Sequence, residues 1–374
     1  MRKSVIGLIC TLLVSCKTND IYSNSELNEV VQEDSDSIVY YDKKFPPVPS
    51  DELAICSFNI TFLGHFKTKA NEALTDLVEN CDGVLIQELV APPWDITFPN
   101  GESSEGDVES LAFVNAMKQH FDGLKLSEEN TGKNSNHASN PEAEYFIFFY
   151  KKKKLEIASD LPQGFLAEPR VKNPVFDRVP YAFGVRAVGS KKTDFVLVSV
   201  HLKATEGSGA VKQGLIVDRL KEWYGIKSWI DQQESAGSER DFFIVGDTNI
   251  EYVEEVDAIT GNDIQPLLKK LTNTDVRKAF EGGDNNYLRD FKTLNYSFNA
   301  AGKPQMQKTN VTNTPKAFDH VFYHPGNSKE VEENFEIVDI TKLFPFSNNI
   351  GTYKGPYSDH NPIRFRLKTM QDDD

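Results

Sequence analysis

Five short polar clusters in this 374-residue chain each follow an apolar run, and their side chains could act together on one substrate. They are Ser57-Phe58-Asn59, Ile86-Gln87-Glu88, Ser199-Val200-His201, Gly246-Asp247-Thr248-Asn249 and Ser358-Asp359-His360. Rigid scaffolds commonly present catalytic groups at strand ends. Carboxylate oxygens suit a hard divalent cation, and histidine exchanges protons near neutral pH. These residue types are typical of a hydrolytic site that combines a metal ion with acid–base chemistry.

The elements that would carry these clusters can be predicted from hydrophobic periodicity. Strand character recurs at residues 53–60, 83–89, 145–150, 180–188, 194–203, 241–246, 319–323 and 363–367. Helical periodicity occupies residues 71–79, 108–121 and 215–230, where apolar side chains recur on one face. The sequence contains no internal repeat. It therefore predicts a mixed α/β protein.

The first fifteen residues predict an export signal that is not part of the fold. Arg2 and Lys3 precede an apolar run too short to span a bilayer, and Ser15 comes directly before Cys16. This pattern resembles a bacterial lipoprotein signal, which implies lipidation of Cys16. An ordinary secretory signal cut nearby is the alternative. Both readings place the mature protein outside the cytoplasm, either lipid-anchored in the bacterial cell envelope or secreted.

The rest of the chain predicts a tether followed by one catalytic domain. Residues 16–50 are rich in Asn, Ser, Asp and Glu, which indicates a flexible acidic tether, and residues 51–370 would form the domain before an acidic tail at 371–374. Without Arg2 and Lys3 the net charge changes from −15 to −17. Such a body argues against general affinity for nucleic acid or anionic membrane, but not against an enzyme that contacts few phosphates through a metal. We expect contact with the membrane only through the lipid anchor.

Two cysteines, Cys56 and Cys81, lie in the predicted domain. They could pair in an oxidising compartment. Because Cys56 falls in a predicted strand, we expect two buried thiols and no disulfide.

Six motifs, in order, resemble the endonuclease/exonuclease/phosphatase superfamily, which includes deoxyribonuclease I, neutral sphingomyelinases and inositol polyphosphate 5-phosphatases. They run from about Ala54 to Pro362 and are Phe58-Asn59-Ile60, Ile86-Gln87-Glu88, Val200-His201-Leu202, Gly246-Asp247-Thr248-Asn249, Phe318-Asp319-His320 and Ser358-Asp359-His360-Asn361-Pro362. Each motif alone is common, whereas six in this order are specific. The resemblance implies a four-layer α/β/β/α sandwich of two packed mixed β-sheets flanked by helices.

The resemblance implies residues that hold the metal ion and the phosphate. Glu88 and Asp359 would be the metal-side carboxylates, for Mg²⁺ or Mn²⁺, with Ca²⁺ as a further candidate. Asn59 and Asn249 would contact the phosphate or a metal-bound water. Arg178, in Asp-Arg-Val-Pro, resembles the phosphate-contacting arginine of the deoxyribonuclease I branch.

The resemblance also implies the acid–base residues. Asp247 would orient or deprotonate the attacking water. His201 and His360 would flank the phosphate, one donating to the leaving oxygen or a phosphate oxygen and the other stabilising the charge of the transition state. Glu144 would support His201, and Asp319 would support His360, each holding the ring oriented and protonated.

Some features depart from that branch. Thr248 occupies a position where Phe or Leu is usual, and the cysteines and calcium loops of deoxyribonuclease I have no counterpart here. These differences weaken the case for close kinship with that enzyme. The other histidines have no matching motif and are predicted to be structural or on the surface: His65, His120, His137, His320 and His324.

The leading functional prediction is a monomeric, extracytoplasmic, metal-dependent endonuclease that hydrolyses DNA, with RNA as an alternative. A second hypothesis keeps the chemistry but changes the substrate to sphingomyelin or an inositol phosphate. The sequence shows no aromatic hairpin for membrane insertion and no Trp-Cys-Asp-Arg string like that of the 5-phosphatases. A third hypothesis is a non-catalytic surface lipoprotein, which would have no need of the complete set of acids, amides and histidines.

Overall fold

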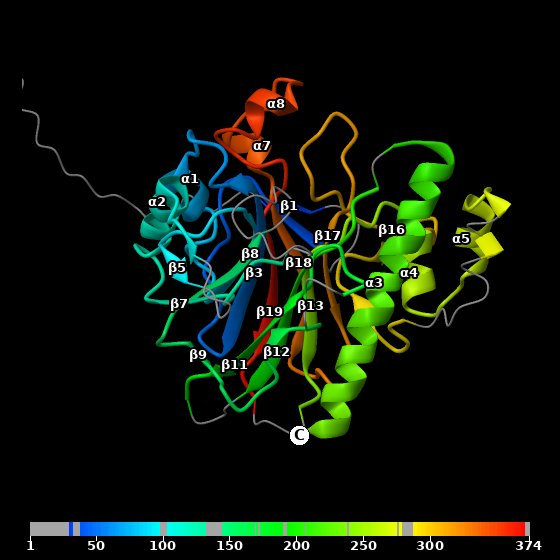
Figure 1. Cartoon of the computed structure of the whole chain (residues 1–374), viewed down its shortest axis with the longest axis horizontal. Helices are drawn as coiled ribbons and strands as arrows, with labels where there is room; N and C mark the ends of the chain where they lie inside the picture. The colour runs from blue at the N-terminus through cyan, green and yellow to red at the C-terminus, as the bar shows by residue number, and fades with distance from the viewer. Residues whose placement is uncertain are drawn as a thin grey trace, which may run out of the picture.

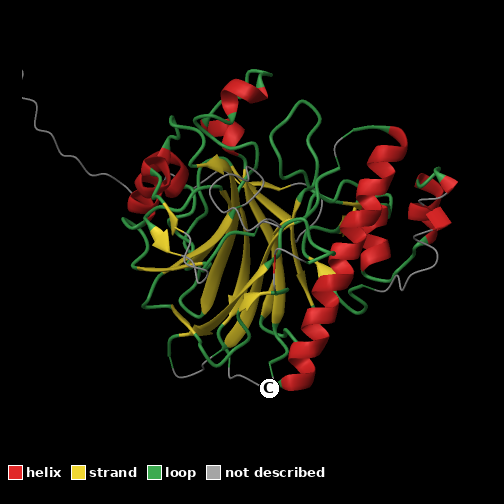
Figure 2. Ribbon diagram, in the orientation of Figure 1, coloured by secondary structure: helices red, strands yellow, loops and turns green. Residues whose placement is uncertain are grey.

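Two mixed β-sheets pack face to face in the computed structural model, and helices cover both outer faces (Figures 1 and 2). The structure describes residues 30–32, 38–97, 103–131, 144–168, 170, 173–189, 193–205, 207–237, 239–274, 277–278 and 287–370. The expected signal, Cys16, His137 and the tail 371–374 lie outside these residues. The four-layer sandwich implied by the motifs is confirmed. Among the described residues, no helix is both long and apolar enough to cross a bilayer.

The first sheet carries the first two motifs, and the last motif lies just before its C-terminal strand. Its strand order is β1 (Val30–Gln32), β2 (Ile38–Tyr41), β18 (Val331–Val338), β19 (Ile363–Lys368), β3 (Glu52–Leu63), β4 (Gly83–Leu89), β8 (Tyr145–Tyr150) and β7 (Gly123–Leu126). Helices α1 (Asn71–Asp76) and α2 (Val108–Met117) lie on its outer face, where Leu74 and Phe113 pack in one cluster with Phe58 of β3. They are on the left in Figure 1.

The second sheet is covered by the longest helix. Its order is β10 (Gly164–Phe165), β11 (Tyr181–Ala187), β12 (Asp194–His201), β13 (Phe242–Asp247), β17 (Asp319–Tyr323) and β14 (Lys292–Thr293), with β9 (Leu155–Ile157) beside β11. Helices α3 (Gly209–Ala236), α4 (Val253–Ile259) and α5 (Gln265–Lys270) pack against its outer side. Short elements lie in the connections: β5 (Ile96–Thr97), β6 (Ser103–Ser104), β15 (Ser297–Phe298), β16 (Pro304–Gln305), α7 (Ile340–Leu343) and α8 (Ile350–Tyr353).

The strands are nearly continuous apolar runs because both of their faces are covered. Successive side chains of a strand alternate between faces. On β12, Phe195 and Leu197 point into the core between the sheets, whereas Val196 and Val198 pack in the cluster formed with α3. Both faces of the strand therefore select apolar side chains.

The predicted tether, residues 16–50, includes residues that belong to the folded domain. Residues 38–50 belong to the sandwich: β2 pairs in parallel with β18, and Phe45 is fully buried beside the Arg364 guanidinium, 4.7 Å from the ring centroid. The segment contains Ile38, Tyr41 and Phe45, which are buried and supply its apolar contacts. The folded domain therefore begins before residue 51.

The expectation of two free thiols is wrong. Cys56 and Cys81 form a disulfide, with Cα atoms 6.1 Å apart, and both residues are fully buried. The reason is topological: β3 and β4 are parallel neighbours, and Cys56 is in register with Val84. The chain returns through α1 to the start of β4 and so brings Cys81 beside Cys56.

Candidate active site

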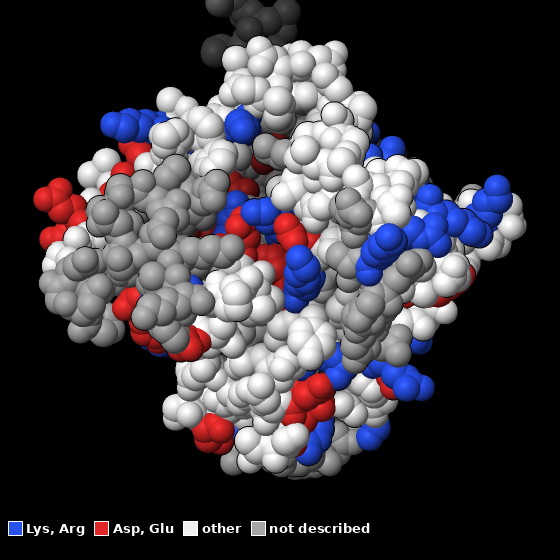
Figure 3. All heavy atoms as spheres, turned by 45° about the vertical axis from the view of Figure 1, so that its right-hand side comes forward, with Lys and Arg blue, Asp and Glu red and all other residues white. Residues whose placement is uncertain are grey.

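The predicted site residues converge on one pocket at a common rim of the two sheets. The pocket has a volume of about 300 Å³. Eight of the predicted residues line it: Glu88, Glu144, Arg178, His201, Asp247, Asn249, Asp359 and His360. In Figure 3 the face turned to the viewer is hollowed, and acidic and basic side chains gather together in the hollow. The motifs, distant in sequence, therefore share one place in the fold.

Each histidine is held by a carboxylate from the opposite sheet. His201 ends β12 in the second sheet, and its Nδ1 lies 2.7 Å from Oε1 of Glu144, which directly precedes β8 in the first. His360 lies shortly before β19 in the first sheet, and its Nδ1 lies 2.8 Å from Oδ2 of Asp319, the first residue of β17 in the second. These are the two pairings that the resemblance implied. Each pair fixes the orientation of its ring.

Both imidazole rings face the same carboxylate oxygen. The Nε2 atoms of His201 and His360 each lie 3.5 Å from Oδ2 of Asp247. The same oxygen accepts a hydrogen bond from Nδ2 of Asn59 at 3.0 Å. Two ring N–H groups and one carboxylate thus point toward a common centre. A tetrahedral anion at this centre could receive a hydrogen bond from each ring.

Burial and neighbouring charges change the proton affinity of the histidines. Burial lowers the pKa of His360, but Asp319 and Asp247 outweigh it and raise that pKa well above its ordinary value. Burial and Arg178 lower the pKa of His201, and Glu144 and Asp247 raise it to a net value above the ordinary one. Both rings are therefore biased toward the protonated form near neutral pH.

The pKa values of two carboxylates of the site, Asp247 and Glu144, are shifted in opposite directions. Burial raises the pKa of Asp247 to about 6, although His360 and His201 act to lower it. Burial also acts on Glu144, but His201 and Arg178 outweigh it, so the pKa of Glu144 lies below its ordinary value. Asp247 can therefore take up a proton close to neutral pH, whereas Glu144 remains ionised.

Glu88 is held in an unusual backbone conformation. It has a φ of 61°, and the pairing of β4 with β8 shifts register between Ile86 and Leu89. A bulge of this kind re-aims a side chain beside a site. The backbone N–H of Glu88 donates to Glu144 at 2.7 Å, and its carboxylate accepts the backbone N–H of Phe62 at 2.9 Å. These bonds hold the carboxylate at the pocket wall.

Asn59 is bonded to two carboxylates of the site. It is fully buried and does not line the pocket. Its Nδ2 donates to Glu88 at 2.8 Å and to Asp247 at 3.0 Å, and its Oδ1 accepts the N–H of Thr61 at 3.0 Å. Because its amide hydrogens have carboxylate acceptors, Asn59 orients these two carboxylates.

Asn249 and Arg178 line the pocket, but each also has a protein partner. β13 ends at Asp247, so Asn249 lies beyond the strand with a φ of 52°, and its Nδ2 donates to the Leu202 carbonyl at 2.9 Å. Arg178 forms an ion pair with Glu144 at 2.7 Å between Nε and Oε1.

Several pocket residues were not predicted. Thr61 contacts the Asp359 carboxylate through its hydroxyl, which also accepts the Asp359 N–H at 3.1 Å. Lys354, between α8 and the Ser-Asp-His motif, lines the pocket. Thr61 lies two residues after Asn59, and its proximity to that motif could have indicated it. Nothing in the sequence around Lys354 distinguishes it from other surface lysines.

The donor set fits a divalent cation. Glu88, His201 and Asp247 each offer a ligand atom, and these atoms lie within 4.8 Å of one another. Glu88, Asp247 and Asp359 are all carboxylates in one pocket, and Glu88 is among the groups that raise the pKa of Asp247. Hard oxygen donors of this kind are the ligands that Mg²⁺ and Mn²⁺ prefer. A bound cation would relieve the repulsion among them.

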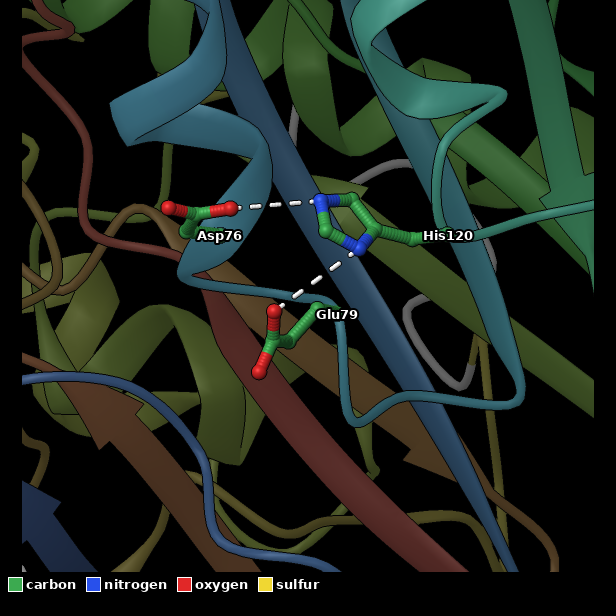
Figure 4. Close-up of side chains that lie close together, drawn as sticks. All are labelled: Asp76, Glu79 and His120. Atoms are coloured by element: carbon green, nitrogen blue, oxygen red, sulfur yellow. Dashed lines mark ion pairs between the residues drawn. The ribbon is translucent and has the colours of Figure 1, made fainter.

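A second acid–histidine cluster is an ion-pair network. His120 Nε2 lies 3.2 Å from Asp76, and His120 Nδ1 lies 3.7 Å from Glu79 (Figure 4). Glu79 is also bonded to Lys44 at 2.6 Å. One ligand atom from each of these three residues lies within 4.8 Å of the others. The described contacts of His120 with the two carboxylates are those of an ion-pair network.

Solved structures with a similar fold include one described as a phosphatase. An endonuclease/exonuclease/phosphatase family protein from Bacteroides thetaiotaomicron is 14% identical, with 86% of this chain and 98% of that chain covered and a TM-score of 0.45. The human Nocturnin catalytic domain with bound sulfate is 13% identical over 84% and 94% of the two chains, with a TM-score of 0.45. ANGEL2, a 2′,3′-cyclic phosphatase, is 11% identical over 85% and 96%, with a TM-score of 0.49. The sequence matches no protein-family model and no curated protein. Likenesses of this size do not specify an activity.

Proposed function

We propose that this chain is a divalent-metal-dependent phosphodiesterase that acts as a monomeric endonuclease, with DNA as the main substrate. The observation that carries the proposal is the pair of carboxylate-held histidines, His201 and His360, whose Nε2 atoms both lie 3.5 Å from one oxygen of Asp247. A phosphate at this position would meet two ring donors and a carboxylate able to accept a proton. A purely structural cluster has no need to aim two imidazoles at one carboxylate.

Asp247 would be the proton acceptor in the reaction. Its Oδ1 accepts the backbone N–H of Asn249 at 2.9 Å, and Asn59 holds its Oδ2. With its pKa raised to about 6, Asp247 is ionised at neutral pH and is a stronger base than an ordinary aspartate. A water molecule would lose a proton to Asp247 as its oxygen attacks phosphorus opposite the leaving oxygen.

The two histidines would have different roles in the reaction. The pKa of His360 lies well above its ordinary value, so this ring stays charged and would stabilise the phosphoryl oxygens. His201, whose pKa is also raised, would donate its Nε2 proton to the leaving oxygen as the phosphorus–oxygen bond breaks. Glu88 and Asp359 would hold a divalent cation, which supplies charge neutralisation at the phosphate.

The proposal is tested by plasmid nicking in Mg²⁺, compared among the wild type, Glu88→Ala, His201→Ala and His324→Ala. His324 directly follows β17 at the end opposite Asp319 and is the matched control. We expect the first two variants to lose at least about 100-fold in rate and the control to retain it. Equal nicking by all four proteins would exclude this mechanism. Release of phosphocholine from sphingomyelin vesicles without nicking would move the assignment to a phospholipase.

We further propose that the protein is exported and lipid-anchored through Cys16. The buried Cys56–Cys81 disulfide supports this proposal, because disulfides persist mainly in oxidising compartments. Labelling of the bacterial protein with a radioactive fatty acid is the direct test, with Cys16→Ser as the comparison. Equal labelling of both forms, or none, would remove the anchor from the proposal.

A further inference from the structure

Three lysine side chains converge on one tyrosine ring at the edge of the pocket. The Nζ atoms of Lys212, Lys270 and Lys316 lie 5.6, 4.5 and 5.8 Å from the centroid of the Tyr252 ring. They come from the start of α3, the last residue of α5 and the segment preceding β17. The convergence is therefore produced by the fold and not by a basic run in the sequence. We call these three side chains the lysine cluster.

The lysine cluster is connected to the pocket through Glu251. Glu251 lines the pocket, and its Oε2 lies 2.5 Å from Nζ of Lys212 and 3.9 Å from Nζ of Lys316. Lys270 pairs with Glu254 at 3.4 Å. In these ion pairs two carboxylates face three ammonium groups. A local excess of positive charge therefore adjoins the pocket of a chain whose net charge is −15.

The lysine cluster is accessible to solvent, and hydrogen bonds connect two of the segments that carry it. The side chains of Lys212, Lys270 and Lys316 are 26, 41 and 37% exposed. Gln213, next to Lys212, donates to the Thr272 hydroxyl at 2.9 Å and accepts the Asn273 N–H at 2.8 Å. These bonds join the start of α3 to the segment that follows α5. The ammonium groups are thus gathered without a ligand, although like charges repel.

We propose that the lysine cluster binds a second phosphate of the substrate, next to the one cleaved, so that the substrate is a nucleic acid strand. This inference rests on the proposed function. Lysine acts as a point charge toward phosphate, and a neighbouring phosphate of a strand is always present beside the scissile one. A choline headgroup carries a single phosphate and a quaternary ammonium, which the lysine cluster would repel. The lysine cluster therefore selects against that headgroup.

The test compares a substrate with one phosphate to a substrate with several. Hydrolysis of a bis-aryl phosphodiester and of a short single-stranded oligodeoxynucleotide is measured with Lys270→Gln/Lys316→Gln, which keeps the Lys212–Glu251 pair. We expect the KM for the oligonucleotide to rise about ten-fold more than the KM for the bis-aryl diester. The slope of log KM against log salt should fall by about 0.7, the value for one phosphate of a single strand. Lys270→Arg/Lys316→Arg should restore both quantities.

A matched control lies on the same helix. Lys221 and Lys227 of α3 pair with Asp218 and Asp231 and do not line the pocket, so Lys221→Gln/Lys227→Gln should leave both substrates unaffected. An equal KM change on both substrates, or an equal effect of the control, would overturn the second-phosphate site. Fluorescence anisotropy with a labelled oligonucleotide measures binding without turnover, and unchanged affinity would also overturn it. Absence of cleavage by the wild type would count separately, against the proposed function.

Discussion

The ring of His360 and the carboxylate of Asp319 are joined at 2.8 Å although they belong to different sheets. Asp319 begins β17, and His360 lies three residues before β19. The carboxylate fixes the ring orientation and is foremost among the groups that raise the pKa of His360 against burial. The charge state of the ring therefore depends on the packing of the two sheets.

Replacing Asp319 by Asn should change the charge of the His360 ring while leaving the position of the ring largely unchanged. Asn keeps the shape but removes the negative charge, so the pKa of His360 should fall and the ring should hold its proton less tightly. We expect a loss of about 10²-fold to 10⁴-fold in kcat/KM for a bis-aryl phosphodiester. Titration of the His360 ring protons by NMR measures the pKa directly. An unchanged pKa in the variant would contradict this account.

Glu222 should act as a positioning residue. This fully buried α3 side chain accepts the backbone N–H of Asp177 at 2.8 Å and of Lys203 at 2.7 Å, in the segments that carry Arg178 and His201. Glu222→Gln offers only one acceptor oxygen, so one of the two bonds is lost. We expect a destabilisation of about 1–3 kcal/mol and a lower kcat. Burial raises the pKa of Glu222 to about 7, so the pH–rate profile of the wild type should contain a component there that the profile of the variant lacks.

A matched substitution on the same helix is Glu234→Gln. Glu234 is partly exposed, far along α3 from the site. The free energy of unfolding of Glu234→Gln, measured in urea, and the kcat of this variant should remain near the wild-type values. Equal kinetic effects of the two substitutions would show that Glu222 has no specific positioning role.

Gly246→Ala should disrupt the site directly. Gly246 has a φ of 134°, and a Cβ atom there would lie 2.4 Å from the Val200 carbonyl oxygen and 3.1 Å from Nε2 of Gln87. Neither the conformation nor the space suits alanine. We expect a lower thermal midpoint and loss of activity. Gly214→Ala, inside α3 with open space around it, should instead stabilise the protein by about 0.5–1 kcal/mol. The reverse order of the two midpoints would refute this reading.

Removing the disulfide should destabilise the fold without touching the site. Cys56 and Cys81 are 25 residues apart, and a closed loop of this length is worth about 3–4 kcal/mol in the chain-entropy account. Cys56→Ala/Cys81→Ala should therefore lower the free energy of unfolding by about that amount, while kcat at low temperature stays close to wild type. Urea unfolding under oxidising and reducing conditions provides the measurement. Reductant should affect only the wild type, and an equal response of the variant would argue against the pairing.

His320 should make stability depend on pH. It is fully buried, hydrogen-bonded to Thr293 at 3.0 Å, and burial lowers its pKa from 6.5 to about 4. The folded form stays neutral while the unfolded chain binds a proton below pH 6.5, so stability is lost as the pH falls from 6.5 toward 4. The difference between the two pKa values corresponds to about 3 kcal/mol. His320→Gln should lack this component between pH 4 and 6.5 in urea unfolding, and an identical pH dependence of both proteins would contradict it.

The central strands could be predicted because burial on both faces leaves an uninterrupted apolar signal. Strands β3, β4, β8, β11, β12, β13, β17 and β19 all fall on predicted runs, with ends shifted by a few residues. β18 was missed because its first half is only partly buried and its sequence includes Glu332, Glu333 and Glu336. Glu336 is buried only because it pairs with Arg364 of β19. This compensation depends on strand pairing and cannot be read from local sequence.

The sequence predicted most of the residues that meet in one pocket, but the bonds among them were not derivable from spacing. Glu144 and His201 are 57 residues apart, and only the packing of the two sheets brings them together. The motifs indicated Asn59 correctly as part of the site. Its role in orienting Glu88 and Asp247 follows from burial, which the sequence around it does not specify.

The site is divided between the sheets, and the carboxylate that holds Nδ1 of each histidine comes from the opposite sheet. Gln87 of the first sheet also donates to Ser199 of the second at 3.2 Å, just beneath the pocket. Neither layer alone contains a complete set of reacting groups. Catalysis would therefore cease as soon as the layers slide or separate, even with every strand still formed. In a chain that crosses a membrane before it folds, the reacting groups would not yet be assembled into an active site.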